Sequence, residues 1–457
     1  MGPQIRSVFL LAAFLLIPRP LWGISEADRL WLVGEQAFGD RLYMLSRRTL
    51  EQFLLRYPQD SRSPAATLLL AKSRLAVGAL EAALDGFRQA QRFVPPPGAP
   101  QEARFWEAET LFKLKRYAVA RDRYQALLDE DAAAPQAPDA FYGLAWSELA
   151  LQRRESAVAA FGQLLDVWPD HPTAPAARFY MARTLTELKR YDEAAAVLTV
   201  FPGRHPGHRL LPEVAYLRGW SLASAGRSAE GVGALKAFIA AYPEHKLVSQ
   251  ARRVVVDALL RSGSKAELAS EYAALLKQSP PTAEGLYDAG AIAEKLGREK
   301  EAENVWRQLR SRFPDHELSA RASLELAEAA FRRNQLKESL TLAGKAGRSP
   351  EPAVRLRALV LIGENELKQR RPEAALKAFQ AAETLEAEDR GLHFRAVAGR
   401  GLAHEELRQW AAAAVAFEAV ASASPDRTLR EWARERLAKV RTRLNPPATA
   451  KPEKPGS

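Results

Sequence analysis

Side chains that could perform chemistry are few in this 457-residue sequence, which has seven histidines and no cysteine. Without thiols, a cysteine nucleophile, a disulfide and a thiolate metal site are all excluded. The closest approach to a metal site is His205 and His208, which flank Pro206 and Gly207. No third or fourth ligand lies nearby in the sequence, and a zinc site needs at least three protein ligands. We therefore interpret this pair as loop residues and expect no bound metal.

Two further sequence motifs resemble catalytic or cofactor-binding motifs but lack the residues or the structural context that those motifs require. His404-Glu405-Glu406 begins like the helix of a zinc protease but lacks the second histidine at the required spacing. Gly231-Val232-Gly233 lies within a predicted helix, whereas a dinucleotide loop connects a strand to a helix. We predict that the chain has no cofactor and is not an enzyme, with a hydrolase of unrecognised active site as the remaining alternative.

A different set of residues is suited to binding. Aromatic residues recur at steps of 37 as Phe105, Tyr142, Phe179 and Tyr216, and Trp146, Arg183 and Trp220 each follow a ladder residue at i+4. Positions i and i+4 are neighbours on one helix face. Tyr, Trp and Arg are the residue types that dominate binding hot spots. These seven residues are candidates for a partner-binding surface, and the alternative is that the aromatic residues pack on the neighbouring repeat.

The elements that must position these residues form a repeat. In rows of 37, one column contains proline, and an earlier column contains small residues with Val256 as the exception. The proline column is Pro58, Pro95, Pro169, Pro206, Pro243 and Pro280, with Ala132 in the one remaining row. The small residues are Gly34, Ala71, Ala108, Ala145, Ala182 and Gly219, followed less strictly by Gly290, Ala327, Gly363 and Gly401. About eleven units are visible.

Each unit has the pattern of two packed helices. A large residue follows the small one at a constant offset, as in Phe87, Tyr124, Phe161 and Phe417, and the intervening turn often contains glycine, such as Gly78. A small residue on the first helix (helix A) lets the second helix (helix B) approach closely. Proline then ends helix B because it lacks the N–H and its ring clashes with the preceding turn. No alternation of period two persists, so no strands are predicted.

This pattern resembles the tetratricopeptide repeat family, whose 34-residue unit places Gly/Ala, aromatic residues, Ala and Pro in a fixed order. Phe141, Leu144, Ala145, Ala157 and Phe161 follow that order before Pro169, and the extra length of each unit follows the proline. Endings such as Tyr57-Pro58, Trp168-Pro169 and Tyr242-Pro243 are similar to those of exported bacterial members, of the Tol-Pal-associated and barrel-assembly kind. The resemblance implies an all-α, right-handed α-solenoid of about eleven repeats of ~37 residues.

The resemblance also indicates what such a protein would do. In the family, the ladder position of Tyr142 lies toward a concave groove that binds peptides. We therefore expect a non-enzymatic scaffold for protein partners in the cell envelope, with the binding surface in the N-terminal half, where the repeat is strictest. The alternative is a component of a polysaccharide-export or peptidoglycan-processing machine, which should have a continuous basic and aromatic groove. Nucleic acid is not expected as a partner because no reading module is present.

The N-terminal segment, residues 1–23, has the character of a secretory signal. Arg6 precedes an apolar run over residues 8–17, and Pro18 and Pro20 follow it. The run is shorter than the roughly 20 residues that span a membrane. We predict cleavage after Gly23 and a periplasmic location, with an uncleaved, membrane-associated signal as the alternative. Because the sequence has no cysteine, a lipoprotein anchor is not expected.

The remaining predictions concern the boundaries. The repeat array should span residues 24–428, followed by a capping helix over 429–444 and a disordered tail over 445–457. The full chain carries a net charge of +11, and residues 429–457 hold eight Lys/Arg against three Glu, a local charge of +5. This basic end favours a solvated cap, with peripheral association at the envelope as the alternative.

Overall fold

The computed structural model describes residues 24–96, 101–386 and 389–444, and over these ranges the only regular elements are helices. The chain divides into two compact units, Met1–Ala251 (unit 1) and Arg252–Ser457 (unit 2). The division falls within α15 (Val248–Ser262). The predicted signal (residues 1–23) and the predicted tail (residues 445–457) lie outside the described residues.

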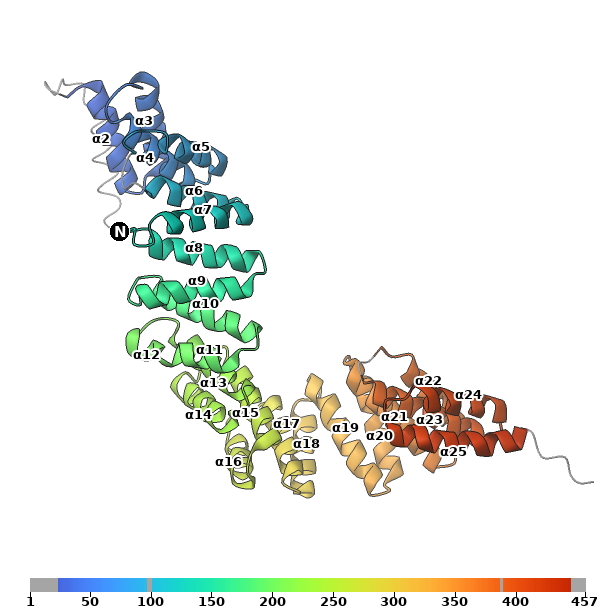
Figure 1. The fold of residues 1–457 in the computed structure, drawn as a ribbon. Coiled ribbons are helices and arrows are strands. Elements are labelled where there is room, and N and C mark those ends of the chain that lie inside the picture. The colour runs from blue at the N-terminus through green and yellow to red at the C-terminus, as the bar shows by residue number, and fades with distance from the viewer. Residues whose placement is uncertain (1–23, 97–100, 387–388, 445–457) are drawn as a thin grey trace, which may run out of the picture. The chain divides into compact units, whose positions relative to one another are not determined.

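Unit 1 is a succession of antiparallel helix pairs, each packed against the next (Figure 1). Its helices before α15 are α2 (Glu26–Gly39), α3 (Tyr43–Arg56), α4 (Ser63–Ala76), α5 (Leu80–Ala90), α6 (Glu102–Lys113), α7 (Tyr117–Glu130), α8 (Ala137–Ala150), α9 (Arg154–Val167), α10 (Ala174–Glu187), α11 (Tyr191–Thr199), α12 (Phe201–Arg204), α13 (Leu211–Ser224) and α14 (Ser228–Ala241). Each residue of the predicted proline column in this unit follows the end of a helix B. The one irregular helix B is divided into α11 and α12, just before Pro202.

Unit 2 continues the same helix-pair construction. Its helices after α15 are α16 (Lys265–Leu276), α17 (Ala283–Lys295), α18 (Glu299–Arg312), α19 (Glu317–Arg332), α20 (Leu336–Ala346), α21 (Pro352–Lys368), α22 (Pro372–Glu383), α23 (Arg390–Glu406), α24 (Trp410–Ala423) and α25 (Arg427–Leu444). The final helix α25 buries Ala433, Leu437 and Val440 against α24 and its neighbours. None of the helices that the structure describes is both long and apolar enough to cross a membrane.

The helix pairs are held by a contact between the small and the large columns of the sequence. A methyl group on Gly34 would lie 2.7 Å from a Leu50 side-chain carbon, and one on Gly219 would lie 2.8 Å from Leu235. The large residues are buried, with Leu50 and Phe161 both 0% exposed. Close packing of this kind leaves no room for an added carbon without displacement of the neighbour. The predicted reason for the small column is therefore confirmed.

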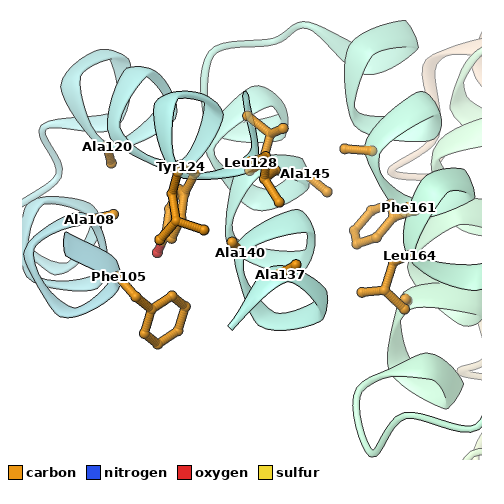
Figure 2. Packing of buried hydrophobic residues seen from close by; sticks show 14 of the residues in the cluster. Phe105, Ala108, Ala120, Tyr124, Leu128, Ala137, Ala140, Ala145, Phe161 and Leu164 are labelled. Atoms are coloured by element: carbon orange, nitrogen blue, oxygen red, sulfur yellow. The ribbon is translucent and has the colours of Figure 1, made fainter. Parts of the chain in front are cut away.

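The core is continuous from one pair to the next. In unit 1, Phe105 and Ala108 of α6 and Tyr124 of α7 belong to one buried cluster with Ala137 of α8 and Phe161 of α9. Figure 2 shows Tyr124 directed from its helix toward Phe105 and Ala140. This cluster also includes Leu84 of α5 and Ala174 of α10, so the pairs α6–α7 and α8–α9 share their core with the helices on both sides, as expected for a repeat that cannot bury its apolar face alone. The predicted all-α solenoid of helix–turn–helix repeats is thus confirmed.

Candidate partner-binding surface

The centre of the candidate surface is an aromatic contact between two successive A helices. Trp146 of α8 lies edge-on to Tyr180 of α10, with ring centroids 4.6 Å apart, and Tyr142 lies 6.2 Å from Trp146. All three rings are partly buried, so each retains an exposed portion. Burial raises the pKa of the Tyr142 hydroxyl. Such rings provide apolar area together with a polar edge, which suits them to a protein interface.

Arg183 extends this cluster along α10. Its guanidinium lies 5.4 Å from the centre of the Tyr180 ring and 3.9 Å from the carboxylate of Glu187. A guanidinium over an aromatic face is attracted by the electrons of the ring. Arg183 is exposed, so it can still donate hydrogen bonds to a partner. We name Tyr142, Trp146, Tyr180 and Arg183 the aromatic strip.

Trp220 lies further along unit 1, on α13. It is partly buried and contacts Tyr191 at the start of α11, with ring centroids 5.6 Å apart. The structure shows no ring contact between Trp220 and the aromatic strip among the described residues. Trp220 therefore provides a separate aromatic position.

The other ladder residues pack inward to different degrees. Phe105 is 8% exposed and lies in the core beside Trp106 and Tyr124. Phe179 and Tyr216 are partly buried, and Tyr216 packs on Phe238 of the following helix B at 5.9 Å. Phe105 therefore supports the surface from the core and is not available for contact with a partner.

Tyr180 is the residue that the sequence reasoning missed. It follows Phe179 by one position and so lies outside the ladder that contains Tyr142 and Tyr216. Its place against Trp146 depends on how α10 is rotated on α8, which the spacing of residues does not specify. The signal that could have found it was the pair of adjacent aromatic residues, Phe179 and Tyr180, of which one must turn away from the core.

Two carboxylates, Glu109 of α6 and Asp139 of α8, lie close enough to interact, and Asp139 precedes Tyr142 on α8 by three residues, which places the two on neighbouring positions of that helix. Glu109 accepts a hydrogen bond of 2.5 Å from the Tyr124 hydroxyl, and burial raises the pKa of Glu109, an effect to which Asp139 adds. Burial also raises the pKa of Tyr124 well above its usual range. The Tyr124 hydroxyl is therefore protonated and donates to Glu109 at neutral pH.

Three A helices of unit 2, α19, α21 and α23, are joined by paired charges. Arg357 of α21 reaches Glu328 at 2.7 Å and Glu325 at 3.5 Å on α19. Arg395 of α23 holds Glu364 of α21 through two hydrogen bonds of 2.6 and 2.8 Å. A cavity of about 250 Å³ lies among these side chains. Burial raises the pKa of Glu325 to about 7.

No group of three or more His, Asp or Glu side chains that could hold a metal ion is present in the described ranges. His205 and His208 do lie close together, with ring centroids 6.4 Å apart.

Comparisons with known proteins identify the repeat. The family model described as tetratricopeptide repeat matches residues 105–153, 142–208, 216–284, 287–351 and 360–428. No curated protein matches the sequence. Among solved structures, a tetratricopeptide repeat protein from Parabacteroides merdae is 15% identical, with 57% of this chain and 99% of that chain covered and a TM-score of 0.39. Yeast Tom70 is 13% identical, with 92% and 96% covered and a TM-score of 0.41.

Proposed function

Because this chain belongs to the tetratricopeptide repeat family, we propose that it is a non-enzymatic scaffold that holds protein partners together in the bacterial cell envelope. Proteins of this family are generally interaction scaffolds. The envelope role is supported by the signal-like residues 1–23 and by the aromatic-proline helix endings, which resemble those of exported bacterial members. We propose that the mature protein acts in the periplasm.

The observation that carries the proposal is the contact of Trp146 with Tyr180, with Arg183 over the latter ring. Large aromatic side chains that are partly exposed and already held in place lose little conformational freedom when a partner binds. The three residue types are those that contribute most to binding energy at protein interfaces. We propose that a peptide segment of the partner lies along this strip and extends toward Trp220.

The distribution of charge favours a protein partner over an anionic polymer. A polymer-binding surface should be continuously basic and aromatic. Instead, Glu109 and Asp139 lie near the strip in unit 1, and Arg357 and Arg395 of unit 2 are already paired with carboxylates. A polyanion would have to displace these carboxylates before it could contact the arginines.

Site-specific cross-linking in intact bacteria tests the proposal. A photoreactive amino acid at position 146 should give a discrete adduct with another envelope protein. The same amino acid at Val167, which is 57% exposed at the end of α9, is the matched control and should give none. An adduct from position 167 but none from position 146 would contradict the binding surface.

The double variant Trp146→Ala and Trp220→Ala measures the energetic contribution. Loss of hot-spot side chains should weaken capture of the cross-linked partner by at least about tenfold, since each such residue contributes roughly 2 kcal/mol. The helical circular dichroism signal should be unchanged, because neither ring is part of a fully buried core. Unaltered capture by the double variant would refute the role of the strip.

A further inference from the structure

One ion pair of unit 1 is replaced by two like charges two repeats further on. Arg104 of α6 forms an ion pair with Glu130, the last residue of α7. In the repeat of Ala182, the same two places hold Arg178 of α10 and Arg204 of α12, which have the same separation in the chain. The carboxylate that neutralises the first arginine is thus replaced by a second arginine.

Arg178 is a buried cation without a hydrogen-bonded partner. The residue is 8% exposed, and its Nε is buried and makes no hydrogen bond. Burial and the charge of Arg204 lower the pKa of Arg178. Two carboxylates lie within electrostatic reach. Asp166 of α9 partly offsets the effect on Arg178, and Asp170 pairs with Arg204 at 3.7 Å while remaining largely exposed.

A second carboxylate is missing at the same end of the repeat. In three other repeats, a loop histidine lies near a carboxylate that precedes it in the chain by the same number of residues. These pairs are His171 with Asp139 at 4.0 Å, His245 with Glu213 at 3.5 Å, and His316 with Glu284 at 3.4 Å. His208 is the corresponding histidine here, since its Nδ1 likewise accepts the N–H two positions on, from Leu210. Ala176 occupies the position that holds the carboxylate in those three repeats.

His205 completes the cluster. Its Nε2 is buried without a hydrogen-bond partner, and its ring lies 5.0 Å from that of Phe201, which anchors α12 in the core. Burial lowers the pKa of His205, and Arg178, His208 and Arg204 add to this effect, while Asp170 opposes it. Buried polar atoms without partners are uncommon in folded proteins and require an explanation.

We propose that Arg178, Arg204, His205 and His208 form a binding site for a carboxylate, supplied by an Asp or Glu side chain of a protein partner. The occupant is inferred from the molecule itself, because carboxylates fill both corresponding places in other repeats. Guanidinium and imidazolium groups donate strong, charge-assisted hydrogen bonds to carboxylates. This inference rests on the proposed scaffold function and gives it a second contact, on the loop side of the repeats.

Binding of hexaglutamate to the full chain tests this proposal. Calorimetric titration with hexaglutamate should show binding, and the histidine NMR signals should show His205 and His208 shifting while His171 and His245 do not. In Arg204→Glu the chain supplies the missing carboxylate, as in the Arg104–Glu130 pair. This variant should unfold at a higher temperature than the wild type and bind hexaglutamate at least about tenfold more weakly. Arg178→Met should also lose binding.

Arg209→Glu is the control, because it makes the same change of charge on an exposed residue of the same loop. It should retain most of the binding. Equal weakening in Arg204→Glu and Arg209→Glu would indicate general attraction of charges and would overturn the site. Inorganic phosphate that binds as well as hexaglutamate, with the same shifts, would overturn the choice of a carboxylate. The Trp146→Ala, Trp220→Ala variant should still bind hexaglutamate, so the two proposals fail separately.

Discussion

Gly290→Ala tests whether the helix pairs depend on the small column of the sequence. An added methyl group on Gly290 in α17 would lie 2.1 Å from Nε1 of Trp306 in α18 and 2.5 Å from two further ring atoms. Trp306 is 2% exposed, and its Nε1 donates to the Tyr287 carbonyl at 3.3 Å. The ring therefore has to move, and that hydrogen bond has to lengthen or break.

The expected change in stability is the sum of two destabilising effects and one stabilising effect. Overpacking of a core costs about 1–3 kcal/mol, and the loss of one hydrogen bond costs about 1 kcal/mol. Alanine in place of glycine within a helix contributes about 1 kcal/mol in the opposite direction. Gly290→Ala should therefore destabilise the helix pair by about 1–3 kcal/mol.

Hydrogen exchange is the appropriate assay, because repeat arrays can unfold in segments and a single unfolding free energy then has no clear meaning. Amides of α17 and α18 should exchange about five- to a hundredfold faster in Gly290→Ala, since about 1.4 kcal/mol corresponds to tenfold. Gly344→Ala is the matched control. It also lies in a helix of unit 2, but an added methyl group would have nothing within 4 Å. Unchanged or slower exchange in Gly290→Ala would refute the reasoning.

For two further substitutions, the structure determines whether the stability of the protein rises or falls. Burial, reinforced by Asp257, raises the pKa of Asp288 from 3.8 to about 7, so the folded state retains a proton that the unfolded state has lost, and wild-type stability falls as the pH rises through that window. In hydrogen exchange, corrected for the intrinsic exchange rate at each pH, the amides of α17 should be better protected in Asp288→Asn than in the wild type at pH 8, by on the order of 2 kcal/mol, and this advantage should vanish toward pH 4. A constant difference would exclude this residue as the cause. Lys189 connects α10 to α11 with a φ of 61°, so Lys189→Gly should raise the stability of this pair by about 0.5–1 kcal/mol, as measured by hydrogen exchange of the α10 and α11 amides. Gly226, with a φ of 85° at the corresponding turn, is the reverse control, and Gly226→Lys should be destabilising.

The helices were predictable because their signals are local. Proline marks the end of most B helices, and the pairing of Gly290 with Trp306, or Gly34 with Leu50, is visible as one constant offset along the sequence. The turn between helix A and helix B could be predicted in only some of the repeats. Its glycines, such as Gly78, indicate a left-handed backbone, but Lys189 adopts the same conformation without any sequence signal. Tertiary packing of two helices enforces this turn even where the residue type opposes it.

The candidate surface was less predictable, because it depends on how neighbouring A helices are rotated. The ladder from Phe105 to Tyr216 follows one register, yet Phe105 is in the core and Tyr142 retains an exposed portion. Tyr180 reaches Trp146 although it is one position out of that register. A period identifies equivalent backbone positions, whereas exposure also depends on the size of the residues opposite, which vary between repeats.

In a repeat protein, a position that departs from the pattern of the other repeats is informative, because the other repeats show which contact is expected there. Where corresponding positions carry the same kind of contact, as with the carboxylates beside His245 and His316, stability of the stack is a sufficient explanation. At Arg178 the ion-pair partner that Glu130 provides for Arg104 is replaced by Arg204, and burial of a cation without such a partner opposes folding. Stability alone would select against that arrangement, and a partner that supplies the carboxylate would remove the penalty. Such unfavourable departures therefore locate function better than the aromatic strip, whose rings also contribute to packing.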